Sequence, residues 1–247
     1  MQWKTSISHI SDGEELIRGY DLKELISKKS FAETIYLVLK GQLPDANQTK
    51  MINALFTAAI DHGIGVSSAM TARLVVSTGN SLHTALAAGI LALGKLHGSA
   101  IEDAAKFFQE NSNATDVAEL VKDLKSRKIR LAGYGHKILK DDPRSQALFE
   151  VARQTGVFGR HCQFALKIHE ELNKISSKKL PINVDGAMAA VMSDMGFDWK
   201  MAKGFFIIGR VPGLVAHVYE EMTSQNGLRR LSQDEVEYTG EPKRELE

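Results

Sequence analysis

The sequence predicts an all-α fold. Apolar residues recur at helical spacing along most of the chain, as in residues 46–62, where Met51, Leu55 and Ala58 share one face. Helix start and stop signals recur throughout, and stretches in which polar and β-branched residues alternate are nearly absent. The chain has 247 residues, of which 43% are hydrophobic and 25% charged. This is enough for one large domain or two smaller ones around a real core.

The expected elements follow from local signals in chain order. Residues 1–20 show no period and are expected to form an irregular arm. Asp21 can cap a short helix, and Ser30 with Glu33 has the spacing of a capping box. Gly, Pro, Asp and Ser at the later breaks set the other boundaries. The expected helices cover residues 21–28, 30–40, 46–62, 67–78, 81–109 (broken at 94–98), 116–128, 144–155, 160–176, 186–195, 199–208 and 213–224.

Three of these segments have a distinctive composition. Residues 81–109 are rich in Ala and Gly, which let helix axes come close, so we expect this segment at the centre of the molecule. Residues 116–128 are charged and are expected to form a solvated outer face. Pro212-Gly213 is expected to kink or split the last helix pair. From Ser232 onward the chain is polar and predicts a loose tail.

Composition excludes several classes of protein. A net charge of +1 argues against a dedicated nucleic-acid surface. The single cysteine, Cys162, excludes an internal disulfide framework and indicates a reducing compartment. The first residues lack a signal-peptide core, and no apolar run is expected to approach membrane-spanning length. We therefore expect a soluble, cytoplasmic protein with neither a nucleic-acid nor a membrane partner.

The stretch around His136 organises the chain. Gly133 and Gly135 allow a tight bend and a close approach to a ligand. The bend presents His136, whose side chain titrates near neutral pH. Asp142-Pro143-Arg144 then has the pattern of a helix start, with Asp142 as N-cap. Taken alone, the stretch favours a surface turn, and the rest of the chain is what indicates a site.

Several polar residues lie at breaks in otherwise apolar surroundings. Taken singly, each has a simpler structural explanation: Asp185 as a helix N-cap, His97 as a satisfied core histidine, His62 as a helix C-cap and Arg210 as a solvated charge. Considered together, they suggest a site. The set is His62, His97, His136, Arg144, Asp185, Arg210 and Arg230.

The order and spacing of these motifs resemble the citrate synthase superfamily. The similarity is strongest to the small citryl-CoA lyases and the C-terminal module of ATP-citrate lyase, and it covers residues 16–231. The motifs that carry it are Arg18-Gly-Tyr20, Asp61-His62-Gly63, Leu96-His97-Gly98, Gly133-Tyr-Gly-His136, Asp142-Pro-Arg144, Asn183-Val-Asp185 and Gly209-Arg210.

The resemblance implies a fold and a set of catalytic residues. It implies a citrate synthase-like arrangement, with a larger helical domain of residues 1–98 and 197–247. A small domain of residues 99–196 would carry the CoA-binding and catalytic loops. In a reverse Claisen cleavage, His136 would take the hydroxyl proton, His97 would contact the enolate oxygen and Asp185 would protonate the carbon.

The resemblance also implies how the substrate is held. His62 would bind the oxaloacetate portion, and Arg144, Arg210 and Arg230 would bind carboxylates, as guanidinium forks do. Arg229 is the alternative to Arg230. In the family the last arginine reaches the neighbouring subunit's site, which implies a homo-oligomer, at least a dimer.

Coenzyme A is expected only as part of substrate and product, with no permanently bound cofactor. The residues expected to hold it are Leu131, Gly133, Gly135, Lys140 and Lys178. By charge alone, Lys137 and Lys179 fit as well as the last two. No metal is expected, because the eight histidines are scattered.

Three functions remain open. The first is a citryl-CoA lyase, and the second is a compact citrate or 2-methylcitrate synthase that condenses an acyl-CoA with oxaloacetate. The third is a non-catalytic binding subunit. No phosphate-binding Gly-rich motif is present, so a lyase would need a separate citryl-CoA synthetase to supply its substrate. Met70 occupies a position where relatives often carry histidine.

Overall fold

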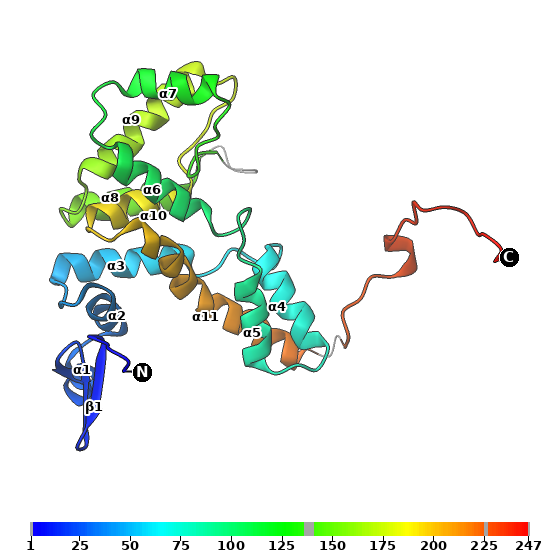
Figure 1. The fold of residues 1–247 in the computed structure, drawn as a ribbon, viewed down its shortest axis with the longest axis horizontal. Coiled ribbons are helices and arrows are strands. Elements are labelled where there is room, and N and C mark those ends of the chain that lie inside the picture. Colours follow the sequence, from blue (N-terminus) through cyan, green and yellow to red (C-terminus); the bar gives the residue numbers. More distant parts are fainter. Residues whose placement is uncertain (1, 136–140, 225–226, 247) are drawn as a thin grey trace. The chain divides into compact units, whose positions relative to one another are not determined.

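The computed structural model describes residues 2–135, 141–224 and 227–246, and helices dominate it (Figure 1). The all-α prediction is confirmed. The helices are α1 Leu22–Lys28, α2 Phe31–Lys40, α3 Ala46–Ala59, α4 Ser67–Ser77, α5 Leu82–Leu91, α6 Ala100–Asn111, α7 Val117–Ser126, α8 Pro143–Gln154, α9 Arg160–Ile175, α10 Val184–Asp194 and α11 Ala202–Thr223. Short 3-10 turns cover Trp199–Met201 and Gln233–Glu235.

Helix boundaries agree with the local capping signals. The Asp21 side chain accepts the Lys23 and Glu24 N–H groups in the first turn of α1. Ser30 and Glu33 form both hydrogen bonds of the predicted capping box at the start of α2. Gly41 ends α2 in the left-handed region at φ +84°. These contacts span two to four residues, which is why the sequence alone locates them.

The N-terminal arm is not irregular, so that expectation was wrong. Strands β1 Ser8–Ser11, β2 Glu14–Ile17 and β3 Tyr20–Asp21 form a small antiparallel sheet. Positive φ angles at both residues of Asp12-Gly13 and of Arg18-Gly19 identify two tight hairpin turns. The Asp-Gly pair was the signal that could have predicted the first hairpin.

Helix α11 continues past Pro212, so the expected split into two helices was wrong. A proline removes one backbone hydrogen bond from a helix, and the bonds on either side can maintain it. The next residue, Gly213, packs so closely on the chain after α3 that a Cβ there would collide with the Ile60 carbonyl oxygen.

Among the described residues, the stretch Trp199–Thr223 is long and apolar enough to cross a membrane by length and composition. The expectation that no run approaches that length was therefore wrong. Part of this stretch belongs to the protein core, since Ala202 and Phe205 are buried. Core helices of globular proteins meet the same criterion, so length and composition alone do not indicate a membrane segment.

Contacts group the chain into two compact units, Met1–His62 with Leu93–Gly213 and Gly63–Ala92 with Leu214–Glu247. In the first unit α10 is the central helix: residues 186–193 are all buried, and α6, α8 and α9 pack against it. In the second unit α4 and α5 pack together around a small apolar cluster that includes Leu214 and Val218. The larger and smaller domains expected from the resemblance group the residues differently and stay a prediction.

Asp194 ties the end of α10 to the start of α9. Its carboxylate accepts the backbone N–H groups of Gly159, His161 and Cys162, each at 2.8–2.9 Å, and the His161 ring at 2.9 Å. The Asp194 side chain is 4% exposed. Burial alone would raise the pKa of this carboxyl, but the hydrogen bonds from His161 and Cys162 outweigh burial and lower it.

We expect Asp194→Asn to lower the free energy of unfolding by about 3 kcal/mol at pH 7, because it removes the charged acceptor of a buried cluster. The pKa of Asp194 is lowered in the folded state, so its stabilisation is complete above the ordinary value of 3.8 and is lost as the pH falls through the folded value. Urea unfolding from pH 7 to pH 3 should show the two proteins converging below about pH 4. Asp198→Asn, at an exposed cap, is the control. A constant difference down to pH 3 would contradict this prediction.

Candidate active site

The glycine loop before residue 136 is hydrogen-bonded to the segment that leads into α10. The Gly133 carbonyl accepts the Asn183 N–H at 3.0 Å, and the Gly135 N–H donates to the Pro181 carbonyl at 2.7 Å. The Asn183 amide group also donates to the Gly135 carbonyl at 3.0 Å. Both glycines have positive φ, +85° and +87°. The loop therefore ends beside the first turn of α10.

Gly133 is required by the approach of a helix. A Cβ at Gly133 would lie 2.8 Å from the Gly186 Cα, and a Cβ at Gly186 would collide with the Gly133 carbonyl oxygen. The sequence analysis attributed the glycines to close approach of a ligand, and for Gly133 the structure shows close approach of α10. This contact places the loop against the turn that carries Asp185.

Asp185 is the second residue of α10 and is half-buried. The N-cap of this helix is Asn183, whose side chain accepts the Gly186 N–H at 3.1 Å. The alternative reading of Asp185 as a helix cap is therefore wrong. Its carboxyl group adds negative charge close to Arg210 instead.

Asp142 positions Arg144 at the start of α8. Its carboxylate accepts the Arg144 backbone N–H at 3.1 Å, Nε–H at 3.0 Å and Nη2–H at 2.9 Å. It also accepts the Val184 N–H at 2.9 Å, so it joins the starts of α8 and α10. Arg144 Nη1 then lies 3.2 Å from His62 Nδ1. The sequence analysis recognised only the capping role of Asp142, because nothing in sequence spacing reveals the contact with Val184.

Arg210 is buried in α11, so its reading as a solvated charge is wrong. It is 3% exposed, its Nε–H donates to the Ala59 carbonyl at 2.9 Å, and its guanidinium lies 5.0 Å from the centre of the Phe206 ring. Within the described residues, Nη1 is buried and has no hydrogen-bond partner. An unused donor on a buried cation is suited to a carboxylate ligand.

Electrostatics connect Arg210 with the other polar residues. Burial is the main cause that lowers the pKa of its guanidinium, and the charge of Arg144 adds to this effect. The carboxylates of Asp61 and Asp185 act in the opposite sense. Asp61 was not among the predicted site residues, although it adjoins His62 in the Asp-His-Gly motif.

His97 lies in the turn between α5 and α6 and is half-buried. Burial, followed by the charge of Arg210 and the proximity of His62, lowers its pKa below the ordinary 6.5. The imidazole is therefore neutral at pH 7 and can donate one ring N–H. The structure thus gathers five of the predicted residues in the first unit: His62, His97, Arg144, Asp185 and Arg210.

The residues predicted to hold CoA lie in different surroundings. Leu131 lines a cavity of about 170 Å³ together with Lys125, Arg130, Tyr134 and Leu180. Lys178 is exposed. The alternative Lys179 pairs with Asp141 at 3.0 Å. His136, Lys140 and the alternative Lys137 lie outside the described residues.

Arg230 belongs to the second unit and is exposed. Its neighbour Arg229 is instead paired with Glu221 through Nε at 2.7 Å.

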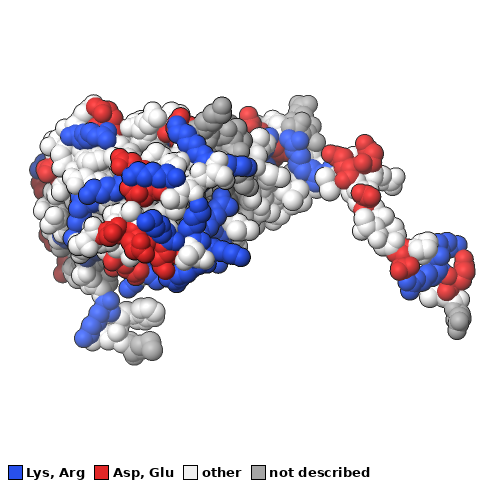
Figure 2. Space-filling view, turned by 90° about the horizontal axis from the view of Figure 1, so that it is seen from above, with Lys and Arg blue, Asp and Glu red and all other residues white. Residues whose placement is uncertain are grey.

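Surface charges are mixed. The face seen from above in Figure 2 carries Lys and Arg interleaved with Asp and Glu. Exposed pairs such as Arg127–Asp123 and Lys28–Glu24 contribute little to stability. Among the residues that the structure describes, no group of three or more His, Cys, Asp or Glu side chains could hold a metal ion.

The chain matches a family model described as citrate synthase, C-terminal domain, over residues 2–58 and 44–232. The chain belongs to the citrate synthase family. This citrate synthase family member is 30% identical over 232 residues to Citrate synthase 2 of Bacillus subtilis (strain 168). The matched region covers 93% of this chain and 61% of that protein. It therefore spans about three fifths of the length of that relative.

Solved structures extend the comparison to the lyase branch. The structure of citryl-CoA lyase from Hydrogenobacter thermophilus is 50% identical, with a TM-score of 0.95, and the match covers 99% of this chain and 97% of that one. ATP citrate lyase from Methanothrix soehngenii, solved in complex with citrate and coenzyme A, is 26% identical with a TM-score of 0.86. That match covers 98% of this chain and 42% of the other. The predicted resemblance is confirmed.

Proposed function

We propose that this protein is a citryl-CoA lyase, which cleaves citryl-CoA to acetyl-CoA and oxaloacetate by a reverse Claisen step. The observation that carries the proposal is the 50% identity to a citryl-CoA lyase over nearly the whole of both chains. The polar cluster of the first unit agrees with it, because it combines buried and half-buried cations with a carboxyl group and a neutral imidazole.

Carboxylates of the substrate would be bound by the arginines. Arg210 offers a buried Nη1 donor, and Arg144 is held in place by Asp142 beside His62. Both guanidinium groups are thus oriented before substrate arrives, which reduces the entropy lost on binding. Arg230 would bind a further carboxylate in the site of a neighbouring subunit.

Bond cleavage needs three proton-handling groups. His136 would take the hydroxyl proton as the C–C bond breaks, which releases oxaloacetate and leaves the thioester enolate. The neutral His97 ring would donate its N–H to the enolate oxygen, where a preorganised donor contributes about 10²–10³-fold to the rate. Asp185, in its acid form, would then protonate the enolate carbon to give acetyl-CoA. Proton exchange with solvent would restore both residues.

Coenzyme A would lie against the loop of Leu131, Gly133 and Gly135, with its phosphates near lysines. Lys178 and Lys140 are the residues proposed from the family. The cavity beside Leu131 adds Lys125 and Arg130 as nearby cations. In this proposal CoA is bound only as part of the substrate and of the product.

A homo-oligomer is part of the proposal. In the second unit, helices α4 and α11 expose large apolar side chains, which suits an interface with a second copy. They are Met70, Leu74, Val215, Tyr219 and Met222. An interface on this face would bury Met70, which is 56% exposed. Light scattering should give a mass of at least twice 27.2 kDa.

The test is a cleavage assay. Purified protein would be mixed with citryl-CoA, and oxaloacetate would be followed through coupled malate dehydrogenase. Rapid oxaloacetate release supports the lyase. Efficient formation of citrate or 2-methylcitrate and CoA from acyl-CoA and oxaloacetate would favour the synthase, which the similarity to Citrate synthase 2 keeps as the second candidate. Inactivity of the folded protein in both directions would leave the binding subunit. If the lyase is active, a separate citryl-CoA synthetase should supply its substrate from citrate.

A further inference from the structure

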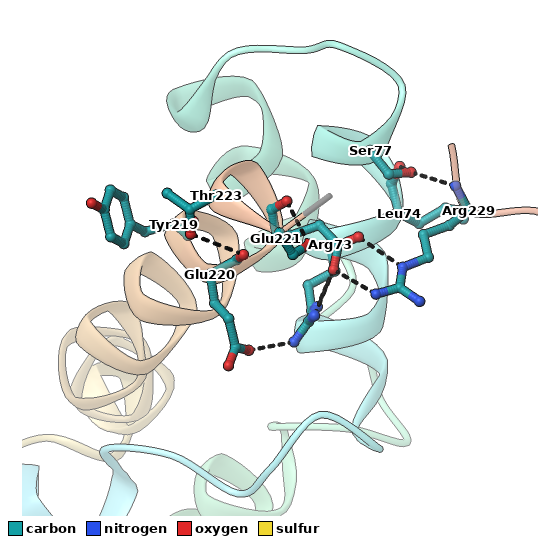
Figure 3. Close-up of polar contacts among 9 residues, drawn as sticks. Arg73, Leu74, Ser77, Tyr219, Glu220, Glu221, Thr223 and Arg229 are labelled. Atoms are coloured by element: carbon teal, nitrogen blue, oxygen red, sulfur yellow. Dashed lines mark hydrogen bonds and ion pairs between the residues drawn. The ribbon is translucent and has the colours of Figure 1, made fainter. Parts of the chain in front are cut away.

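Glu221, near the end of α11, is the centre of a charged cluster in the second unit (Figure 3). Its side chain is 2% exposed. Arg73 of α4 donates its Nε–H to the Glu221 carboxylate, and Arg73 Nη2 lies 2.6 Å from the same carboxylate oxygen. Arg229 donates from Nε at 2.7 Å and from Nη2 at 3.1 Å. One buried carboxylate thus holds two guanidinium groups that lie 156 residues apart in the sequence, 229 less 73.

The backbone of Arg229 is held as well. Its N–H donates to the Ser77 hydroxyl oxygen at 3.2 Å, and that hydroxyl donates to the Leu74 carbonyl at 2.7 Å (Figure 3). The chain after α11 is therefore attached to α4 through both the main chain and the side chain of one residue. An attachment by two independent contacts restricts the position and the direction of the following residue.

The following residue, Arg230, is in a different situation. Like Arg229 it is exposed, but it makes no hydrogen bond or ion pair with any described residue. Of the two adjacent arginines, Arg229 is ion-paired with the buried Glu221 of its own unit, and Arg230 is exposed to solvent. Arg229 already uses its Nε–H and one Nη2–H on Glu221, so one of the two edges with which a guanidinium can bind a carboxylate bidentately is occupied.

We propose that Arg73, Glu221 and Arg229 form a clamp that positions Arg230 for the substrate carboxylate. This inference rests on the proposed function. It makes Arg230 the ligand-binding member of the pair and makes Arg73, Glu221 and Arg229 positioning residues. The exposed partner of Arg73, Glu220, is not part of the clamp, although its carboxylate lies 2.6 Å from Arg73 Nη1.

Charge and geometry explain why this cluster can act as a clamp. A carboxylate near a helix C-terminus is disfavoured by the helix dipole and by burial, so Glu221 depends on its two cations. Hydrogen bonds from Arg229, followed by those from Arg73, lower the pKa of Glu221 and keep it charged. Both guanidinium groups reach it with two nitrogen atoms, which fixes their orientation better than a lysine could.

A double-mutant cycle tests the clamp in the full-length protein. Arg230→Ala is expected to raise KM for citryl-CoA by about 10–100-fold, because a hydrogen-bonded charge pair is lost. Arg229→Gln should raise KM about tenfold and change kcat little. It loosens the position of the substrate-binding Arg230 and leaves the proton-transfer groups unchanged. Arg229→Gln with Arg230→Ala should be no worse than Arg230→Ala alone, because both changes act through the same guanidinium.

Glu221→Gln and Glu220→Gln are the matched pair. They make the same chemical change at adjacent residues, but the Glu221 side chain is 2% exposed and that of Glu220 is 66% exposed. Glu221→Gln should raise KM as Arg229→Gln does, and Glu220→Gln should leave it near the wild-type value. Thermal unfolding and light scattering should confirm that the Arg229→Gln protein is folded and has the wild-type mass.

The outcomes separate the clamp from the function on which it rests. Non-additive KM effects in an active enzyme support the clamp. Fully additive effects, or equal effects of Glu221→Gln and Glu220→Gln, would overturn the clamp and leave the lyase in place. A wild-type protein that cleaves no citryl-CoA would overturn both.

Discussion

Replacing Asp185 with Asn is expected to lower kcat for citryl-CoA cleavage by about 10²–10⁴-fold, the usual contribution of a positioned acid. An amide has nearly the same shape as the carboxyl group but cannot supply its proton to the enolate carbon. The N-cap of α10 is Asn183, so its hydrogen bond to the Gly186 N–H is kept in the variant, which should fold. Steady-state kinetics with the coupled assay measure kcat, and thermal unfolding checks the fold.

The control for this prediction is Asp116→Asn. Asp116 is a true N-cap, whose side chain accepts the Glu119 N–H at 2.9 Å at the start of α7. Asn is an equally good cap, so both stability and kcat should stay near the wild-type values. A kcat for Asp185→Asn within about threefold of wild type would remove Asp185 from the proposed proton transfer.

Replacing Gly186 with Ala is expected to damage both stability and activity. The added Cβ would collide with the Gly133 carbonyl oxygen and come within 3.0 Å of the Gly133 Cα. Both neighbours are backbone atoms, so the glycine loop must move away from α10. Overpacking of this kind costs about 1–3 kcal/mol. Displacing catalytic groups by about 1 Å can cost about 10²-fold in rate.

Gly204→Ala is the matched control, because Gly204 is also a helical glycine. A Cβ there would have no neighbour within 4 Å. Alanine should therefore stabilise α11 by about 0.5–1 kcal/mol, through its higher helix propensity. Denaturant unfolding and the cleavage assay would be run on both variants. A Gly186→Ala protein as stable and active as Gly204→Ala would show that the contact with Gly133 does not position the loop.

Local hydrogen bonds made much of the fold predictable. The Asp21 cap, the Ser30–Glu33 box and the Gly41 stop depend on residues two to four positions apart, and the structure forms all of them. Predictions failed where a local preference was overruled or overlooked. Pro212 did not divide α11, and the Asp12-Gly13 turn signal went unused.

Composition located the core only in part. The small residues of 81–109 predicted a central segment, and α6 does contribute the buried Ile101 and Phe108. The central helix of the first unit, however, is α10. Small residues permit close packing, but they do not specify which helix lies opposite, so α10 could not be identified from composition.

The sequence by itself determined the helices, their caps and, through the order of its motifs, the membership of the citrate synthase family and the residue types of the site. Only the tertiary structure decided what those residues do in space. It buried Arg210, gave Asp142 a second partner in Val184 and joined Arg73 of α4 to Glu221 of α11. A cap or a turn is a contact between near neighbours in the chain. These decisions depend on contacts between helices distant in sequence, and they are set by packing that no local pattern records.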